Sequence, residues 1–408
     1  MSKLQELIDR LCPNGVEFKP LGEVCEFKRG DTLSSKDAIE GDVPVMAGGQ
    51  KPSCYHNVAN RSGETIVIAG SGAYAGFVTY WNIPVFVSDA FSVNPSNCLL
   101  TKYVFYFLKN NQEKIHATKK GAGVPHVHGK DIAKFIIPVP PLEVQEEIVR
   151  ILDRFSEYAA ELQAELQARK KQYEYYRNLL LTFNSSASGY GTDDEQKDSV
   201  TNWGGSSYKI QWMKMGEIGT FIRGNGLQKK DFRESGVGCI HYGQIYTHYG
   251  TFATKTKSFV DATLAKNLLK VEKGDIVLAC TSENIEDVAK AVAWLGNGTI
   301  VTGGHSVVFK HKENPKYIAY YFQTSLFFNQ KKKYAYGAKV IDIKTEDLAK
   351  ILIPVPPLEV QEKIVGILDR FETLVNDLSK GLPAEIETVR ERYEYYRNKL
   401  LTFKEIPA

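Results

Sequence analysis

The chain has 408 residues, of which 43% are hydrophobic and 24% are charged. This composition is typical of soluble globular proteins, and the length predicts two or three domains. No apolar run approaches the ~20 residues needed to cross a bilayer, and residues 1–15 contain no secretory hydrophobic region. The six cysteines form no CxxC pair and no CxxH run, so the sequence predicts a cytoplasmic protein with reduced thiols, no disulfide framework, no metal and no membrane.

The net charge of +3 is unevenly distributed. Residues 208–357 carry 21 Lys and Arg against 13 Asp and Glu, whereas residues 142–183 and 358–403 each carry two more acidic than basic residues. A basic domain beside acidic segments indicates a polyanionic partner contacted by the domain. The alternative is a lysine-rich surface that only aids solubility.

One long segment occurs twice. Residues 137–155, IPVPPLEVQEEIVRILDRF, return as IPVPPLEVQEKIVGILDRF at 353–371, and YEYYRNLLLTF from Tyr173 returns as YEYYRNKLLTF from Tyr393. Such a duplication predicts a two-fold, internally repeated architecture.

Each copy opens a long helix. In the first copy, side chains follow one another at alternating spacings of four and three residues, and only Arg169 interrupts the apolar seam. This spacing is typical of a coiled coil, about 63 Å long from Leu142 to Phe183 at ~1.5 Å per residue. The seam positions are Ile148, Leu152, Phe155, Ala159, Leu162, Leu166, Arg169, Tyr173, Tyr176, Leu180 and Phe183.

The second helical segment carries a four-residue stutter near Gly381 and Pro383, where we expect the helix to break or kink. Because a domain separates two seams of similar length, we expect the two helical segments to pack on each other as an antiparallel pair.

The regions before each helical segment share a weaker skeleton of short β-branched runs separated by Gly, Asn and Asp, which predicts mixed, mainly β domains. The matched segments are LGEVCEFKRG (21–30) with MGEIGTFIRG (215–224), TIVIAG (65–70) with DIVLAC (275–280), AFSV (90–93) with GHSV (304–307), TKYVFYFL (101–108) with PKYIAYYF (315–322) and GAGV (121–124) with GAKV (337–340).

The predicted fold is therefore α+β, with two mixed, mainly β domains in pseudo-two-fold arrangement joined by two long helices. The predicted parts are a first domain (1–141), a central helical segment (142–183), a flexible linker (184–207), a second domain (208–357), a C-terminal helical segment (358–403) and a tail (404–408).

Enzyme motifs were not found. The chain has no GxxxxGK[ST] phosphate loop and no [DN]PP[FYW] amino-methyltransferase motif. The glycine-rich segment at 69–76 is followed by a β-like run rather than a helix, which disfavours dinucleotide binding. His126 and His128 have no nearby Cys or acidic cluster to complete a metal site.

With its duplicated IPVPPLEVQE…ILDRF segments, its YEYYRN segments and its LGE[VI] domain start, the chain resembles the specificity (S) subunit of bacterial Type I restriction–modification systems over essentially its whole length. The resemblance implies a non-catalytic subunit whose two target-recognition domains each read one half of a split double-stranded DNA sequence. It also implies an antiparallel helical spacer that binds two methyltransferase subunits and, through them, restriction subunits. S-adenosylmethionine and ATP would then be bound by those partners and no cofactor by this chain. Residues 160–167, AELQAELQ, resemble the tandem tetrapeptide associated in this family with the spacing of the half-sites. A different class remains open, a coiled-coil assembly adaptor whose variable domains bind proteins.

Candidate DNA-contacting residues come from polar, glycine-flanked turns mixed with aromatic residues, since Arg, Lys, Gln and Asn can read base edges and Gly admits a close phosphate. In the first domain they are Lys28, Arg29, Asp31, Gln50, Ser71, Tyr74, Lys119, Lys120 and His126. In the second domain they are Arg223, Asn225, Gln228, Lys229, Lys230, Tyr242, Gln244, Tyr246, His248, Thr281, Ser282, Glu283, Asn284, Lys331, Lys332, Lys333, Tyr336 and Lys339.

Overall fold

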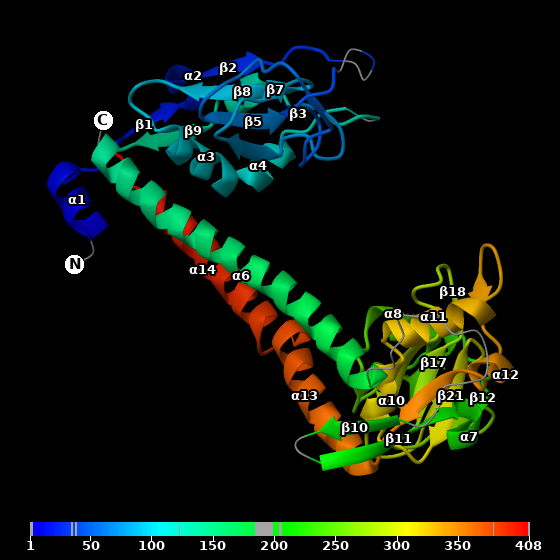
Figure 1. Ribbon diagram of the computed structural model, residues 1–408. Coiled ribbons are helices and arrows are strands. Elements are labelled where there is room, and N and C mark those ends of the chain that lie inside the picture. Colours follow the sequence, from blue (N-terminus) through cyan, green and yellow to red (C-terminus); the bar gives the residue numbers. More distant parts are fainter. Residues whose placement is uncertain are drawn as a thin grey trace. The chain divides into compact units, whose positions relative to one another are not determined.

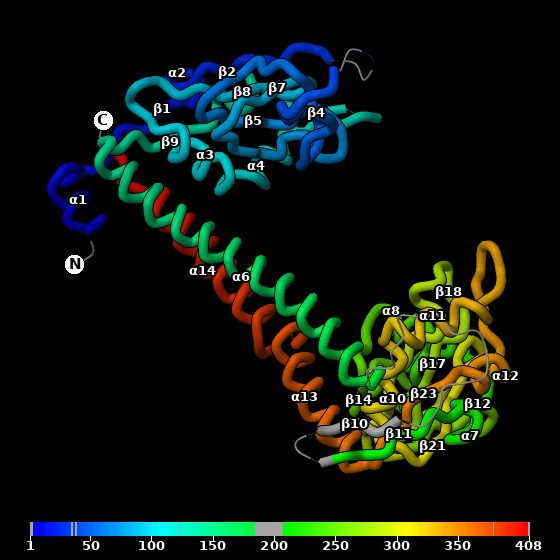
Figure 2. Tube along the Cα trace, in the orientation of Figure 1, coloured from blue at the N-terminus to red at the C-terminus, as the bar shows by residue number. Residues whose placement is uncertain are grey.

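The computed structural model describes residues 3–33, 36, 39–121, 123–183, 199–203, 206–377 and 379–406. The chain forms two compact units, one from Met1–Ala164 with Ala384–Ala408 and the other from Glu165–Pro383. Each unit therefore combines one sheet-rich domain with parts of both helical segments (Figures 1 and 2).

The domain of the first unit is built on a four-stranded sheet in the order β2-β8-β5-β6, with a three-stranded sheet β4-β3-β7 and the pair β1-β9. All five residues of β5 are buried, as expected for a continuous apolar run inside a sheet. The strands are β1 (Glu17–Pro20), β2 (Cys25–Arg29), β3 (Val43–Met46), β4 (Cys54–His56), β5 (Thr65–Ala69), β6 (Val78–Trp81), β7 (Phe86–Val87), β8 (Ala90–Pro95) and β9 (Ile136–Val139). The helices before the long helical segment are α1 (Lys3–Leu11), α2 (Leu21–Val24), α3 (Thr101–Asn110), α4 (Gln112–Ala117) and α5 (Gly129–Ile132).

The domain of the second unit has a five-stranded sheet β12-β21-β17-β19-β14, a four-stranded sheet β15-β13-β20-β16, a three-stranded sheet β10-β11-β23 and the pair β18-β22. Its strands are β10 (Ser199–Trp203), β11 (Ser206–Lys214), β12 (Gly219–Arg223), β13 (Val237–Ile240), β14 (Phe252–Ala253), β15 (Ser258–Val260), β16 (Leu269–Val271), β17 (Ile276–Ala279), β18 (Thr281–Ser282), β19 (Lys290–Trp294), β20 (Ile300–Thr302), β21 (Ser306–His311), β22 (Ile341–Asp342) and β23 (Leu352–Val355). Its helices are α7 (Met215–Ile218), the 3₁₀ turn η1 (Lys229–Asp231), α8 (Tyr242–Thr247), α9 (Ala262–Ala265), α10 (Pro315–Tyr321), α11 (Ser325–Tyr334) and α12 (Thr345–Leu348).

The two domains repeat one another strand by strand, because the order β2-β8-β5-β6 returns as β12-β21-β17-β19. Arg29 pairs with Phe91, and its counterpart Arg223 pairs with Val307, so Phe91 corresponds to Val307. The predicted match of AFSV with GHSV is therefore wrong by two residues. The two segments were aligned on their shared Ser-Val dipeptide. The true correspondence is set by strand pairing, which an identity over two residues does not determine.

The long helices are α6 (Leu142–Thr182), α13 (Leu358–Asn376) and α14 (Leu382–Leu400). In the first unit, Phe155 near the start of α6 stacks on Tyr396 near the end of α14, with ring centroids 5.5 Å apart. In the second unit, Phe371 near the start of α13 stacks on Tyr176 near the end of α6 at 5.6 Å. In both units the start of one helical segment meets the end of the other, which confirms the predicted antiparallel pair (Figure 1).

The predicted break near Gly381 is also confirmed, because α13 ends at Asn376 and α14 begins at Leu382. Gly381 has φ +77°, and an added Cβ would lie 2.6 Å from the carbonyl oxygen of Thr373. Glycine is required here because both the backbone angle and the close approach exclude a side chain.

Residues 184–198 of the predicted linker 184–207 lie outside the described residues. Within the predicted linker, Ser199–Trp203 form a strand, because β10 pairs with β11 in antiparallel register. The average composition of the range hid a short run with β propensity at Val200 to Trp203. Among the described residues, no helix combines the length and the apolar character needed to span a bilayer.

The duplicated segments attach each long helix to its own domain through matching contacts. The first repeat holds Asp153, whose carboxylate accepts bonds of 2.6 Å from Lys102 and Tyr106 of α3. The second repeat holds Asp369, which accepts bonds of 2.7 Å from Lys316 and Tyr320 of α10. The duplicated sequence therefore forms the same contacts between a long helix and its domain in both copies.

Candidate nucleic-acid interface

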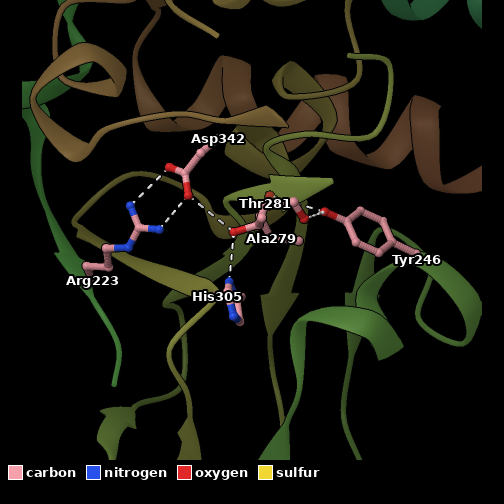
Figure 3. Close-up of polar contacts among 6 residues, drawn as sticks. All are labelled: Arg223, Tyr246, Ala279, Thr281, His305 and Asp342. Atoms are coloured by element: carbon pink, nitrogen blue, oxygen red, sulfur yellow. Dashed lines mark hydrogen bonds and ion pairs between the residues drawn. The ribbon is translucent and has the colours of Figure 1, made fainter. Parts of the chain in front are cut away.

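In the second domain, polar side chains gather where several strands end. Arg223 is the last residue of β12, Thr281 opens β18, His305 directly precedes β21 and Asp342 ends β22. Their interactions converge on one point (Figure 3). We call these four residues the strand-end cluster of the second domain.

Charge-assisted hydrogen bonds hold this cluster. Nη1 and Nη2 of Arg223 donate to Oδ1 and Oδ2 of Asp342 at 3.0 and 2.6 Å. The Oγ1 of Thr281 donates to Asp342 Oδ2 at 3.3 Å and lies 3.0 Å from His305 Nδ1. Tyr246 adds a bond from its hydroxyl to the carbonyl oxygen of Thr281 at 2.7 Å. The hydrogen bond to Asp342 raises the pKa of the Arg223 guanidinium above its ordinary value, so Arg223 stays charged.

The first domain has a corresponding cluster of Arg29, Ser71, Asp89 and His126. The backbone fixes the correspondence, because Gly70 N bonds Asp89 O at 3.1 Å as Cys280 N bonds His305 O at 3.0 Å. The Ser71 hydroxyl donates to the Asp89 carboxylate. The side chain of Arg29 is exposed and has no ion pair with any described residue.

A hollow of about 340 Å³ lies over the first cluster. Its lining includes Arg29, Asp89, His126, His128 and Lys130. Both histidines, Arg29 and Lys130 are exposed, so the hollow offers cationic and hydrogen-bonding groups to an incoming ligand beside the apolar side chains of Phe27 and Phe91.

Each cluster lies at the base of a matching hairpin loop. Lys120 bridges to His126 in the first domain, and Tyr336 bridges to Asp342 in the second. The loop tips expose Val124 and Val340 equally, at 57% each. The glycines at the loop starts, Gly121 and Gly337, have φ of +108° and +113°, a region that favours glycine.

Most of the predicted DNA-contacting residues of the first domain have exposed side chains, and Arg29 and His126 belong to the cluster itself. Two predicted residues are not exposed. Ser71 is buried and donates a hydrogen bond to Asp89. Lys119 is half-buried, and its ammonium group donates to the carbonyl oxygen of Ala73 at 3.2 Å. Lys120 pairs with Asp131 at 2.7 Å. The exposed predicted residues are Lys28, Arg29, Asp31, Gln50, Tyr74, Lys120 and His126.

In the second domain the structure brings some predicted residues to the cluster and leaves others away from it. Tyr242 packs on His305 with ring centroids 4.9 Å apart, and Ser282 pairs with Ile341 beside Asp342. No described interaction joins Lys332, Lys333 or His248 to the cluster. The predicted residues with exposed side chains are Arg223, Asn225, Gln228, Lys229, Lys230, His248, Glu283, Asn284, Lys332, Lys333, Tyr336 and Lys339.

Two predicted contacts in the second domain are corrected by burial. Lys331 is only 3% exposed, and its Nζ donates to the carbonyl oxygens of Glu286 and Val288 at 2.8 and 2.6 Å. Gln244 is 9% exposed and donates to Ser258 Oγ at 2.6 Å. Both side chains have internal partners, because the helices that carry them turn these positions toward the core, and neither is presented to a surface ligand.

Three members of the clusters, Asp89, His305 and Asp342, were not among the predicted residues. The match of GAGV with GAKV already aligned His126 with Asp342, so the sequence held a signal for that position. The two-residue error in the AFSV match hid the correspondence of Asp89 with His305. Within the described ranges, no group of three or more His, Cys, Asp or Glu side chains could hold a metal ion.

Comparison with known proteins points to one family. A family model described as "Type I restriction modification DNA specificity domain" matches residues 13–170 and 209–388. The chain is 28% identical to a protein of Haemophilus influenzae named as a type I restriction enzyme specificity subunit, over 95% of this chain and 96% of the relative. It is also 28% identical to the Escherichia coli EcoR124I/EcoR124II specificity subunit, over 99% of this chain and 97% of the relative.

A solved structure shows the same fold. The S subunit of a Type-I restriction-modification system from M. genitalium superimposes with a TM-score of 0.56 at 17% sequence identity, covering 95% of this chain and 96% of that chain. At this identity the likeness concerns the fold alone.

Proposed function

This chain belongs to the Type I restriction modification DNA specificity family, and we propose that each of its two sheet domains reads one half of a split DNA sequence. Family membership makes it the DNA sequence-recognition subunit of a restriction–modification complex, without catalysis of its own. The adaptor alternative, in which the domains bind proteins, is not favoured by this membership.

One observation carries the assignment of the reading surface: the two domains share a backbone frame and place different polar side chains at the same strand ends. Asp89 and His305 stand at one shared position, and His126 and Asp342 stand at another, while Arg29 matches Arg223. A frame that stays constant while its polar groups change is what two readers of different half-sites need. Arg, Thr, His and Asp can all contact base edges in the major groove.

The surroundings of the clusters supply contacts to the DNA backbone. Lys130 and Lys120 stand exposed beside the first cluster, and the exposed lysines of the second domain include Lys229, Lys230, Lys332, Lys333 and Lys339. Lysine ammonium groups neutralise phosphates without regard to sequence. Phosphate contacts would set the register of each domain on the duplex, and the clusters would then read the bases.

We further propose that methyltransferase subunits bind the long helices. Tyr175 and Tyr395 occupy matching places in the YEYYRN repeats and are 63% and 61% exposed. Leu142 and Leu358, at the two helix starts, are 41% and 53% exposed. Large apolar side chains exposed at duplicated positions indicate two docking sites of one kind, and hence two copies of one partner. Restriction subunits would join through these partners, which would also bind S-adenosylmethionine and ATP.

The test is salt-dependent DNA binding by the chain assembled with its methyltransferase subunits. A bipartite site should bind more tightly than a scrambled duplex, and the logarithm of affinity should fall linearly with the logarithm of salt concentration. Replacing Lys332 and Lys333 with Ala should flatten this slope by about 0.9 for each phosphate that is no longer neutralised, for all DNA sequences alike. Replacing Lys170 and Lys171 of α6 with Ala removes the same charge outside the sheet domains and should keep the wild-type slope.

Absence of any preference for a bipartite site in the assembled complex would contradict the recognition function. An unchanged slope in the Lys332 and Lys333 variant would show that α11 does not face the DNA.

A further inference from the structure

The acid and the histidine of the strand-end clusters exchange places between the two domains. In the first domain the acid, Asp89, precedes β8 and the histidine, His126, ends the hairpin loop. In the second domain the histidine, His305, precedes β21 and the acid, Asp342, ends the hairpin loop.

This exchange decides whether the shared arginine has a partner. Asp342 receives both Nη groups of Arg223. The Asp89 carboxylate instead accepts a hydrogen bond from the Ser71 hydroxyl. Arg29 lines the open hollow and forms no ion pair with any described residue. The same frame thus pairs one arginine with an acid and gives the other no acidic partner among the described residues.

The carboxylate of Asp342 is itself held firmly. Its backbone N–H and C=O both pair with Tyr336, at 2.9 and 3.0 Å, and its Oδ2 accepts from Thr281. Its side chain is 19% exposed, whereas that of Arg223 is 38% exposed. The fixed acid is therefore the inner member of the pair and the arginine is the outer one.

The outer arginine keeps donors free for a ligand. Its pairing with Asp342 uses one hydrogen on each Nη, which leaves Nε–H and the second Nη2–H parallel along one edge of the guanidinium group. Two parallel donors match the N7 and O6 acceptors of guanine in the major groove. Because the side chain is fixed before binding, little rotamer freedom is given up when the base is bound.

We propose that Arg223, positioned by Asp342, reads a guanine in the half-site of the second domain, and that Arg29, which has no such partner among the described residues, discriminates less at the equivalent place in the first half-site. This inference rests on the proposed DNA-reading role of the two domains. Asp342 is a positioning residue, and Arg223 is the base-contacting residue.

The experiment measures affinity for a set of duplexes in which each base pair of the recognised site is replaced in turn, using the chain assembled with its methyltransferase subunits. The Arg223→Lys variant keeps the positive charge and removes the two parallel N–H donors of the guanidinium group. The Asp342→Asn variant removes the carboxylate that holds Arg223. Both variants should lose discrimination at one and the same guanine, by about 5- to 150-fold. The other half-site and the salt slope should stay as in the wild type. Arg29→Lys should lose less at its own position.

A charge-matched control is Glu234→Gln, since Glu234 is exposed in the same domain and has no described partner. It should leave every base preference unchanged. Tighter binding by the Asp342→Asn variant would overturn the proposal, because Asp342 would then withhold Arg223 from DNA. An unaltered base preference in a normally folded Arg223→Lys variant would overturn it as well. Both results would leave the recognition function standing, whereas a wild-type complex without sequence preference would remove the function itself.

Discussion

A lysine that looked like a phosphate contact in the sequence is an internal support of the second domain. The ammonium group of Lys331 is buried beside the rings of Phe327 and Phe328 and donates to the carbonyl oxygens of Glu286 and Val288. Those carbonyls close the loop that carries Ser282, Glu283 and Asn284. Any effect of Lys331 on the proposed DNA contacts would therefore come through the shape of this loop.

Burial gives Lys331 a distinct pH signature, since it lowers the pKa of this lysine to about 8. The unfolded chain has the ordinary value of 10.5, so between pH 8 and 10.5 the unfolded state binds more protons than the folded state. Stability due to this group therefore rises with pH across that interval. The free energy of unfolding of the wild type should gain roughly 1–3 kcal/mol over Lys331→Met between about pH 8 and 10.5 in denaturant titrations.

The neighbouring Lys332 provides the comparison, because it is exposed on the same helix. A Lys332→Met variant should follow the wild-type pH profile throughout. Parallel profiles for the wild type and the Lys331→Met variant would show that the buried ammonium is not held as described.

Among the elements, the joint between each long helix and its domain is the duplicated feature with the clearest energetic consequence. Asp153 binds Lys102 and Tyr106, and burial with the hydrogen bond to Asp153 raises the pKa of Tyr106. The tyrosine is thus a neutral donor to a charged acceptor, a bond worth about 1.5–3 kcal/mol. Asp153→Asn should lower the free energy of unfolding by roughly 2 kcal/mol in chemical denaturation.

The same destabilisation is expected for Asp369→Asn, because Lys316 and Tyr320 repeat the contacts. Glu146 lies exposed on α6 without a described partner, so Glu146→Gln should change stability by less than about 0.5 kcal/mol. If Asp153→Asn were as stable as Glu146→Gln, the joint would not be held by this carboxylate.

Helices were predictable here and strand pairing was less so, for a physical reason. The seam from Ile148 to Phe183 and the break at Gly381 follow from local periodicity, which one stretch of sequence contains in full. Strand register depends on pairing with strands far away in the chain. The shared Ser-Val dipeptide therefore gave the wrong alignment of residues 90–93 with residues 304–307. The strand at Val200 was missed because a linker-like composition surrounded it.

The site followed the same division. Exposed polar turns such as those of Arg29, Arg223 and Tyr336 could be anticipated from glycine-flanked loops. The sequence could not predict which of these residues would pair with an acidic side chain, because Arg223 and Asp342 lie 119 positions apart in the chain. Burial of Lys331 depends likewise on tertiary packing that a run of three lysines does not reveal.

At the scale of the whole molecule, each unit contains parts of both helical segments. The first unit takes residues from both ends of the chain, and Val16 pairs with Lys404 and Ile406 through backbone bonds of 2.9 and 3.1 Å. The boundary between the units falls inside α6, between Ala164 and Glu165. Each domain thus has its joint to a long helix within one unit, and the residues at the boundary are not part of either strand-end cluster.

The tandem tetrapeptide AELQAELQ at residues 160–167 spans this boundary, with Leu162 and Leu166 both buried at 6% exposure. One additional AELQ would lengthen α6 by about 6 Å and shift its seam as a stutter, a change that the other helical segment already contains near Gly381. Since neither strand-end cluster is altered, both half-sites should remain the same. The number of unread base pairs between them should grow by about one or two, because each base pair spans about 3.4 Å of the DNA axis.

Methylation-site mapping with the assembled complex measures both quantities at once. A variant that replaces residues 160–163 with AQLE keeps the length and the buried leucine, and it should retain the wild-type spacing. An altered half-site, or a spacing that the insertion leaves unchanged, would show that the helices do not set the separation of the half-sites. A longer spacing with intact half-sites would assign sequence choice to the sheet domains and distance to the helices.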